Sequence, residues 1–219
     1  MTPRPLPRGV WDFDPAGWPP DDCVAAGADL EPSTLVDAYR VGAFPMPVDG
    51  LLRWWSPMYR GVLRPGDLRI SRSLRRSMRR YQVTADTAFE AVIDACADRA
   101  RPGAWIDDSI RDAYVRLHRL GWTHSVEVWD GPDLVGGLYG VAVGGLFAGE
   151  SMFHRATDAS KVALVELVRR WSGPGEPWLI DTQWSTPHLA SLGVSELPRI
   201  DYLTLIADLV DRPPRDVWS

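Results

Sequence analysis

Three segments joined by two tight turns constrain the fold of this chain most strongly. Residues 125–129 alternate between apolar and polar side chains, and residues 134–143 and 146–153 follow after Gly131–Pro132–Asp133 and Gly144–Gly145. Glycine and proline at such positions are typical of short connections in which the chain reverses direction. Two reversals in succession predict a three-stranded antiparallel meander.

Helices are predicted on both sides of this meander. Before it, apolar residues recur at helical spacing within residues 32–42, 71–81, 87–98 and 107–120, whereas residues 43–57 are expected to form a loop. After it, we expect a helix at residues 158–171, a strand at 178–183 and helices at 186–192 and 201–210. This order predicts an α+β fold with a mostly antiparallel sheet. We expect a small helical or mixed N-terminal domain over residues 1–104 and a second domain over residues 105–219.

The composition is that of an ordinary globular protein, with 45% hydrophobic and 24% charged residues among 219. The longest uncharged run lies between Asp133 and Glu150, is rich in glycine, and is shorter than the roughly 20 apolar residues of a membrane helix. The two cysteines, Cys23 and Cys96, form no paired motif. We therefore expect no membrane contact, and a location in the reducing cytoplasm.

Positive charge is concentrated in one short stretch, although the net charge is −5. Six arginines and no acidic residue lie within residues 69–80. In the predicted helix at residues 71–81, the apolar residues fall on one side and arginines on the other. Such a patch attracts phosphates nearby despite the overall negative charge. A solvated surface with no partner is the alternative.

Several familiar sites are excluded by the absence of their motifs. The chain has no phosphate-binding GxxxxGK[ST] loop, no GxGxxG after a strand and no GxSxG nucleophile elbow. Its four histidines, His118, His124, His154 and His188, lack the spacing of metal ligands. We therefore expect neither a metal ion nor a nucleotide cofactor.

Polar residues within apolar strands mark the best candidate site. Asp181 and Gln183 lie two residues apart in the strand at 178–183, so their side chains point to the same face. Glu150 lies in the last strand of the meander, between Gly149 and Ser151. Buried carboxylates are costly unless they are paired or hydrogen-bonded. From the residues alone, a structural role in holding neighbouring loops and a functional role are both open.

A series of short motifs gives the chain a specific resemblance. Over residues 27–205, it resembles the bacterial leucyl/phenylalanyl-tRNA–protein transferases in motif order and spacing. The motifs are Gly42–Ala43–Phe44–Pro45, Trp54–Trp55–Ser56–Pro57, Gly136–Gly137–Leu138–Tyr139–Gly140, Gly149–Glu150–Ser151–Met152–Phe153, Ala159–Ser160–Lys161, Leu179–Ile180–Asp181–Thr182–Gln183 and His188–Leu189–Ala190–Ser191–Leu192–Gly193.

The resemblance implies a reaction without a cofactor. Leu or Phe, and Met less efficiently, would move from aminoacyl-tRNA to the N-terminal Arg or Lys of an acceptor protein, which marks that protein for degradation through the N-end rule. The resemblance also implies that residues 105–219 form a catalytic domain like the GCN5-related acetyltransferases, preceded by an N-terminal domain with a basic helix. The meander, helix and strand order agrees with this implication.

The resemblance further implies which residues form the site. Asp181 and Gln183 are the expected catalytic pair, with Glu150 orienting Asp181 or receiving the cationic acceptor. The expected aminoacyl pocket comprises Trp54, Trp55, Trp105, Leu138, Phe153, Leu164, Leu167 and Ile180, for each of which core packing is the alternative. Leu138 stands where methionine can occur and Leu167 where an aromatic can occur, which leaves the balance between Leu and Phe open. The basic helix would bind tRNA through Arg72, Arg75, Arg76, Arg79 and Arg80.

Two other functions compete with this interpretation. An acyl-CoA-type N-acyltransferase on the same fold would need a glycine-containing pyrophosphate loop, yet residues 155–161 contain no glycine. A non-catalytic tRNA- or peptide-binding module would not need Glu150, Asp181 and Gln183 together.

Overall fold

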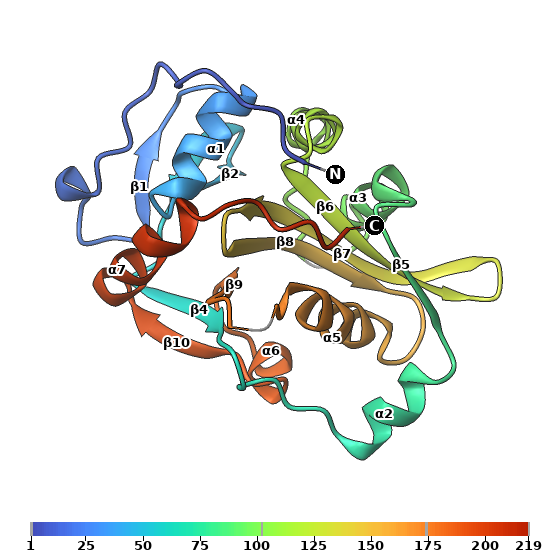
Figure 1. The fold of residues 1–219 in the computed structure, drawn as a ribbon. Coiled ribbons are helices and arrows are strands. Elements are labelled where there is room, and N and C mark those ends of the chain that lie inside the picture. Colours follow the sequence, from blue (N-terminus) through green and yellow to red (C-terminus); the bar gives the residue numbers. More distant parts are fainter. Residues whose placement is uncertain (1, 102, 174, 219) are drawn as a thin grey trace.

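The computed structural model describes residues 2–101, 103–173 and 175–218, and it shows a mixed α+β architecture with two sheets (Figure 1). The larger sheet has seven strands in the order β10-β4-β9-β8-β7-β6-β5, and the smaller has three in the order β1-β3-β2. All pairs in both sheets are antiparallel except β8 with β9. The predicted α+β class with a mostly antiparallel sheet is thus confirmed.

The predicted meander is the centre of the larger sheet. It consists of β6 (Thr123–Asp130), β7 (Asp133–Val143) and β8 (Leu146–His154). The two predicted turns join them, with Asp130 opposite Asp133 and Val143 opposite Leu146. Beyond β8, the helix α5 (Ala159–Trp171) carries the chain to the parallel strand β9 (Leu179–Gln183). This crossover places the end of β9 beside the middle of β8.

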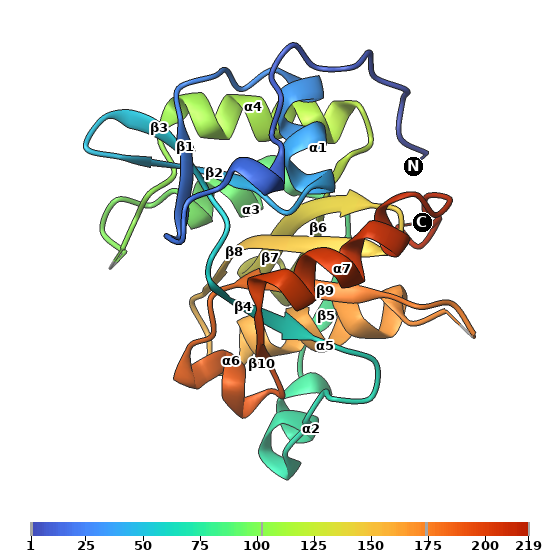
Figure 2. The same ribbon diagram turned by 90° about the vertical axis from the view of Figure 1, so that its left-hand side faces the viewer.

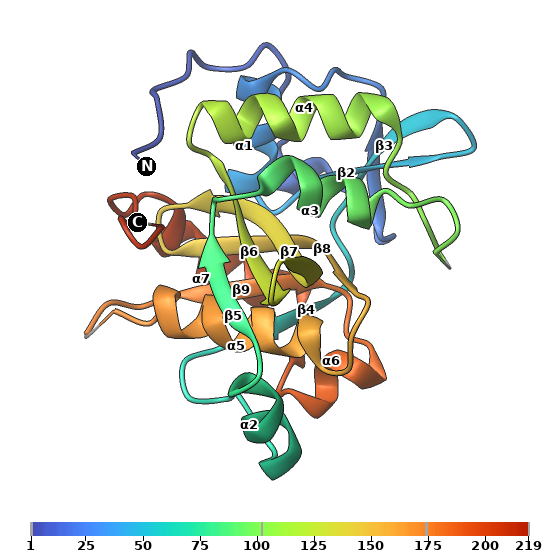
Figure 3. The ribbon, with the colours of Figure 1, turned by 90° about the vertical axis from the view of Figure 1, so that its right-hand side faces the viewer.

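Helices cover both faces of the larger sheet. On one face lies α5, next to α2 (Arg72–Met78) and α6 (Pro187–Ser191) (Figure 2). Gly136 on β7 allows this packing, because a Cβ there would lie 2.5 Å from the Cβ of Ala159. The other face carries α1 (Pro32–Arg40), α3 (Phe89–Cys96), α4 (Asp108–Arg119) and α7 (Arg199–Val210) (Figure 3). Each face buries its own apolar core.

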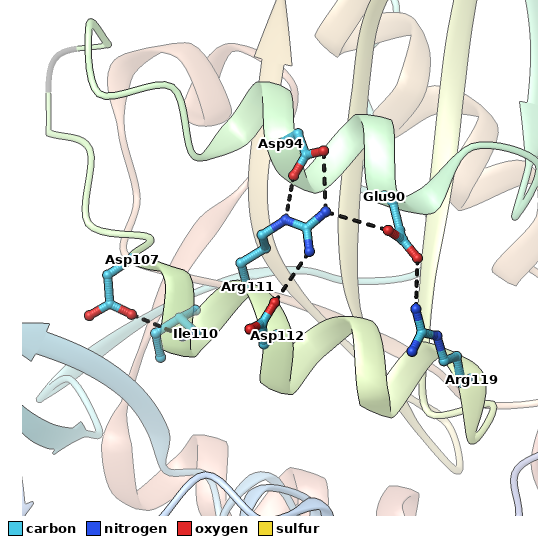
Figure 4. Close-up of polar contacts among 7 residues, drawn as sticks. All are labelled: Glu90, Asp94, Asp107, Ile110, Arg111, Asp112 and Arg119. Atoms are coloured by element: carbon cyan, nitrogen blue, oxygen red, sulfur yellow. Dashed lines mark hydrogen bonds and ion pairs between the residues drawn. The ribbon is translucent and has the colours of Figure 1, made fainter.

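Charged side chains join α3 to α4 at the surface. Arg111 contacts Glu90 and Asp94 of α3 as well as Asp112, and Arg119 contacts Glu90 (Figure 4). Exposed pairs of this kind contribute about 0–1 kcal/mol each. They therefore orient the α3–α4 pair, while its buried apolar side chains supply most of its stability.

Residues 43–57 are not the predicted loop. They form the hairpin of β2 (Phe44–Val48) and β3 (Leu51–Trp55), to which β1 (Cys23–Ala26) adds a third strand. Proline at positions 45 and 47 indicates a loop rather than a strand, so β2 was not predicted from the sequence. Both prolines fit because β2 lies at the edge of its sheet, where a missing N–H costs no ladder hydrogen bond.

Three strands of the larger sheet were not predicted. They are β4 (Tyr59–Leu63), β5 (Gln82–Ala85) and β10 (Ser195–Pro198), each of four or five residues. Because β4 and β5 precede residue 104, the sheet includes strands from both sides of the expected domain boundary. The division into residues 1–104 and 105–219 and the likeness to acetyltransferases stay predictions. No helix within the described part of the chain is long and apolar enough to cross a membrane.

Candidate active site

Asp181 lies at the centre of the candidate site, in the middle of β9. Its side chain is fully buried and forms a two-pronged ion pair with Arg60 of β4. Arg60 Nε donates to Asp181 Oδ1 at 2.8 Å and Nη2 donates to Oδ2 at 2.6 Å. Tyr202 of α7 donates its hydroxyl to Oδ2 at 2.8 Å. A carboxylate bonded by a guanidinium fork is held in position as well as compensated in charge.

Arg60 is itself enclosed on all sides. It has no exposed surface, its Nη1 donates to the carbonyl of Gly42 at 3.0 Å, and its guanidinium lies 4.9 Å from the ring centre of Phe44 and 4.5 Å from that of Tyr202. Burial acts to lower the pKa of Arg60, but the charge and hydrogen bonds of Asp181 together with the neighbouring Tyr202 and Glu150 outweigh this, and the net pKa is raised. Arg60 is therefore a permanent cation that ties β4 to β9.

Gln183 ends β9 in an unusual conformation. Its φ is +58°, in the left-handed region that costs a residue with a Cβ free energy, and its backbone N–H donates to Asp181 Oδ1 at 2.8 Å. Opposite it on β4 stands Gly61, where a Cβ would lie 2.7 Å from the carbonyl carbon of Trp184. The missing side chain of Gly61 thus makes room for this turn. Gln183 Nε2 is buried with no hydrogen-bond partner in the described structure.

Glu150 lies on β8 and is bonded on one side only. Its Oε2 accepts a hydrogen bond from Tyr114 of α4 at 3.1 Å, and the Tyr114 hydroxyl also bonds to that of Tyr39 on α1. Its Oε1 is buried and has no partner among the described residues. Burial raises the pKa of Glu150 to about 8, against the opposing effect of the hydrogen bonds from Tyr39 and Tyr114.

Two adjoining cavities meet at Glu150 and Gln183. The first cavity has a volume of about 240 Å³. Its walls are mostly apolar and include Leu138, Leu164 and Ile180. The second, of about 300 Å³, is walled by residues that include Phe44, Met46, Trp105 and Trp184. The five residues that line both cavities are Glu150, Thr182, Gln183, Thr186 and Leu189.

The structure distributes the eight expected pocket residues unevenly. Leu138, Leu164, Leu167 and Ile180 line the first cavity and Trp105 lines the second. Trp55 does not line either cavity but its ring lies 6.2 Å from that of Trp184, which does. Trp54 and Phe153 are buried in the core, where Trp54 packs on Phe13 with ring centres 4.6 Å apart. A pocket role for these three aromatic residues stays a prediction.

The arginines expected to bind tRNA lie on and just after α2. Arg72, Arg75, Arg76, Arg79 and Arg80 are all exposed, whereas Leu74 is buried against the body of the protein. Arg80 pairs with Asp130 of β6. The remaining four form no ion pair with any residue that the structure describes, so their charge is open to a partner.

Sequence reasoning missed the residues that hold the site together. Arg60 and Tyr202 contact Asp181, and Tyr39 and Tyr114 support Glu150. The only signal in the sequence for Arg60 is a single charge within the otherwise apolar segment Tyr59–Leu63. Among the described residues, no group of three or more His, Cys, Asp or Glu side chains is placed to hold a metal ion.

Comparison with known proteins agrees with the motif series. A family model described as leucyl/phenylalanyl-tRNA protein transferase matches residues 62–207, and a model of the N-terminal domain of that family matches residues 28–58. The chain is 50% identical to a leucyl/phenylalanyl-tRNA–protein transferase of Anaeromyxobacter sp. (strain Fw109-5), covering 98% of this chain and 94% of the relative. It is 51% identical to the protein of that name from Pseudomonas putida (strain W619), covering 100% and 95%.

Proposed function

The chain belongs to the leucyl/phenylalanyl-tRNA–protein transferase family and is an aminoacyltransferase, and on that premise we propose that it moves leucine or phenylalanine from aminoacyl-tRNA to the N-terminal Arg or Lys of acceptor proteins. Methionine is a poorer donor in this proposal. The reaction takes place in the cytoplasm and marks the acceptor for degradation through the N-end rule.

The observation that carries the proposal is the junction of the two cavities. Glu150 Oε1 and Gln183 Nε2 are both buried and have no hydrogen-bond partner in the described part of the chain, and both residues line both cavities. Buried polar atoms are normally hydrogen-bonded, so an unbonded acceptor and an unbonded donor on two residues that line the same cavities indicate a place where a substrate completes the bonding. A reaction that joins two substrates needs a site where both substrates meet, and the junction of the two cavities provides one.

The proposed reaction requires little of the protein beyond bringing the two substrates together. The donor is an activated ester, so no nucleotide has to be hydrolysed. An N-terminal amine has an unperturbed pKa of about 7.7–8.0, so part of it is neutral and nucleophilic at pH 7. The site must orient the two substrates, accept a proton and stabilise the oxyanion. Gln183 engages the attacking amine, with Asp181 and Glu150 as the charged groups beside it.

Alanine variants of the catalytic pair test this assignment. We expect Asp181→Ala and Gln183→Ala proteins that keep the wild-type circular dichroism spectrum to transfer leucine at least about 100-fold more slowly, since misplacing a reacting group by about 1 Å can cost about 10²-fold. Gln82→Ala, at an exposed position of β5, is the matched control and should transfer at the wild-type rate. Wild-type rates for both site variants would refute the assignment.

The first cavity fits the side chain of the donor amino acid. Its apolar walls include Leu138, Leu164, Leu167 and Ile180, and apolar burial contributes about 25 cal/mol for each Å² removed from water. A side chain that is unbranched at Cβ, such as that of Leu, Phe or Met, can enter, and we propose that β-branched residues are rejected. The second cavity offers the rings of Trp105 and Trp184 for stacking with the terminal adenine of the tRNA.

The exposed arginines of α2 are proposed to contact the phosphates of the tRNA. Neutralising Arg76 and Arg79 to Gln should weaken binding of aminoacyl-tRNA and reduce the slope of its salt dependence by about 2. The control neutralises Arg119 and Arg169, whose side chains are 71% and 70% exposed on α4 and α5 and whose loss changes the net charge equally. Equal slopes for the two double variants would refute a role for α2.

An acyl-CoA donor is disfavoured by the start of α5. Asp158 precedes this helix, and its hydrogen bond with Lys161 lowers the pKa of the carboxyl group, so it is an anion. A pyrophosphate bound at the helix N-terminus would have to compete with this carboxylate for Lys161. A non-catalytic binding module is disfavoured by the unbonded atoms of Glu150 and Gln183, because a module without chemistry has no need of two such groups on residues that line the same cavities.

A further inference from the structure

The two carboxylates of the site differ in how completely they are bonded. Asp181 Oδ1 accepts from Arg60 Nε and from the backbone of Gln183, and Oδ2 accepts from Arg60 Nη2 and from Tyr202. An ionised carboxylate has about four lone-pair directions, and all four are occupied here. Asp181 also has no exposed surface and lines neither cavity.

Glu150 is the opposite case. One of its oxygens accepts from Tyr114, whereas Oε1 is buried and has no hydrogen-bond partner among the described residues, and Glu150 is a lining residue of both cavities. An atom that accepts a proton from the attacking amine must come within hydrogen-bonding distance of it. Of the two carboxylates, only Glu150 belongs to a residue that lines the cavities, and only Glu150 has an oxygen without a hydrogen-bond partner among the described residues.

On the basis of this geometry, and resting on the proposed aminoacyl transfer, we infer that Glu150 accepts the proton, and that Arg60 and Tyr202 are positioning residues that fix Asp181 as an anion beneath Gln183. The task of Asp181 is to hold the backbone of Gln183 in its left-handed conformation through the 2.8 Å hydrogen bond. Asp181 is therefore a positioning residue as well, since it reaches the substrates only through Gln183.

The atoms of the reaction balance with Glu150 as the only protein acid–base group. The amine nitrogen attacks the ester carbonyl carbon and forms the new C–N bond, while a proton of the amine passes to Glu150 Oε1. The C–O bond to the ribose then breaks, and the ribose oxygen takes the proton from Glu150 Oε1. Glu150 ends as it began, ready for the next pair of substrates.

The surroundings of Glu150 tune it for this task. Burial raises the pKa of Glu150 to about 8, close to that of the α-amine from which it would take the proton. The other titratable and charged groups around it come from the neighbouring elements, and they are Tyr39 of α1, Tyr114 of α4, Tyr139 of β7, Arg60 of β4, Asp181 of β9 and His188 of α6. The hydrogen bond from Tyr114 lowers the pKa of Glu150, so its loss raises that pKa further.

Two buried tyrosines provide a matched test, because each donates one hydrogen bond to one of the two carboxylates. Rates of leucine transfer from charged tRNA to a peptide beginning with Arg are measured from pH 6 to pH 10 for the wild type, Tyr114→Phe and Tyr202→Phe. We expect Tyr114→Phe to move the rising limb of the pH–rate profile to higher pH by about one unit, the effect of a hydrogen bond to a charged group. Tyr202→Phe should lower the rate several-fold at every pH and leave the limb in place.

The opposite pattern would overturn the inference. If Tyr202→Phe moved the limb and Tyr114→Phe did not, Asp181 would be the proton acceptor. A Glu150→Gln protein that transferred leucine within threefold of the wild-type rate would overturn it as well. Failure of the wild type to transfer any leucine would instead contradict the proposed function, so the two failures are distinguishable.

Discussion

Replacing Glu150 by Gln should stabilise the protein at alkaline pH. The pKa of this carboxyl group rises from its ordinary value of 4.5 to about 8 on burial, so between these pH values folding takes up a proton that the unfolded chain does not bind. The free energy of unfolding therefore falls as the pH rises from about 4.5 to about 8. Glutamine has nearly the same shape and carries no charge, so it removes this dependence.

The magnitude follows from the same pKa. At about 1.4 kcal/mol for each tenfold change in proton affinity, the full effect is about 5 kcal/mol. Water that enters the two cavities solvates the charge and reduces this penalty, so we expect Glu150→Gln to exceed the wild type in stability by about 2–5 kcal/mol at pH 9 and by less than about 1 kcal/mol at pH 5.

Urea denaturation of both proteins at pH 5, 7 and 9 measures the difference directly. Glu196→Gln is the control, because Glu196 lies exposed on the edge strand β10, and its stability should follow the wild type at each pH. If the difference in the free energy of unfolding between the wild type and Glu150→Gln were the same at pH 5 and at pH 9, Glu150 would not be a buried carboxyl group with a raised pKa.

Three further substitutions test the residues that hold Asp181 and Gln183 in place and the residues that line the first cavity. Arg60→Met should destabilise the protein by about 3–5 kcal/mol in urea denaturation at pH 7, because it leaves the buried Asp181 without its cation, and a loss below about 1 kcal/mol would contradict the buried pair. Gly61→Ala should slow leucine transfer at least about 10-fold, because its Cβ would meet the Trp184 backbone beside Gln183, whereas Gly17→Ala, which meets nothing within 4 Å, should not. Leu167→Phe should fill part of the first cavity and reduce transfer of phenylalanine more than that of leucine, and an equal loss for both would place the donor side chain elsewhere.

The elements that the sequence predicted well are those specified by neighbouring residues. The meander depends on turns at Gly131 and Gly144, and α4 begins after Asp107, whose side chain accepts from the N–H of Ile110 at 2.9 Å. Turn chemistry, a cap and an apolar stripe all act over a few residues. Such local signals are visible without knowledge of the rest of the fold.

The strands and contacts that were missed depend on distant partners. The strand β4 is five residues long and forms because β9 and β10, more than a hundred residues later, pair with its two edges. Arg60 meets Asp181 only through that pairing. A single arginine in a short apolar segment gives no indication of which acid it will face, so the ion pair at the centre of the site could not be predicted.

The candidate site was predicted only in part, because some of its contacts are local in the sequence and others depend on distant partners. Asp181 and Gln183 share a strand, so their proximity follows from the sequence, and Glu150 reaches the same cavities through the parallel pairing of β8 with β9. The pocket role expected for Trp54 rested on the family resemblance alone. Trp54 packs on Phe13 in the core, whereas Trp184, which no motif had singled out as a pocket residue, lines the second cavity.

The most direct test of the proposed function is the mass of an acceptor peptide after the reaction. The protein is incubated with leucyl-tRNA and a peptide beginning with Arg, and in parallel with the same peptide carrying an acetylated N-terminus or with an acyl-CoA in place of the tRNA. We predict that the free peptide alone gains one leucine residue, at its N-terminus, and only from the tRNA. An unchanged mass with leucyl-tRNA, or a product formed from the acyl-CoA, would contradict the proposed function.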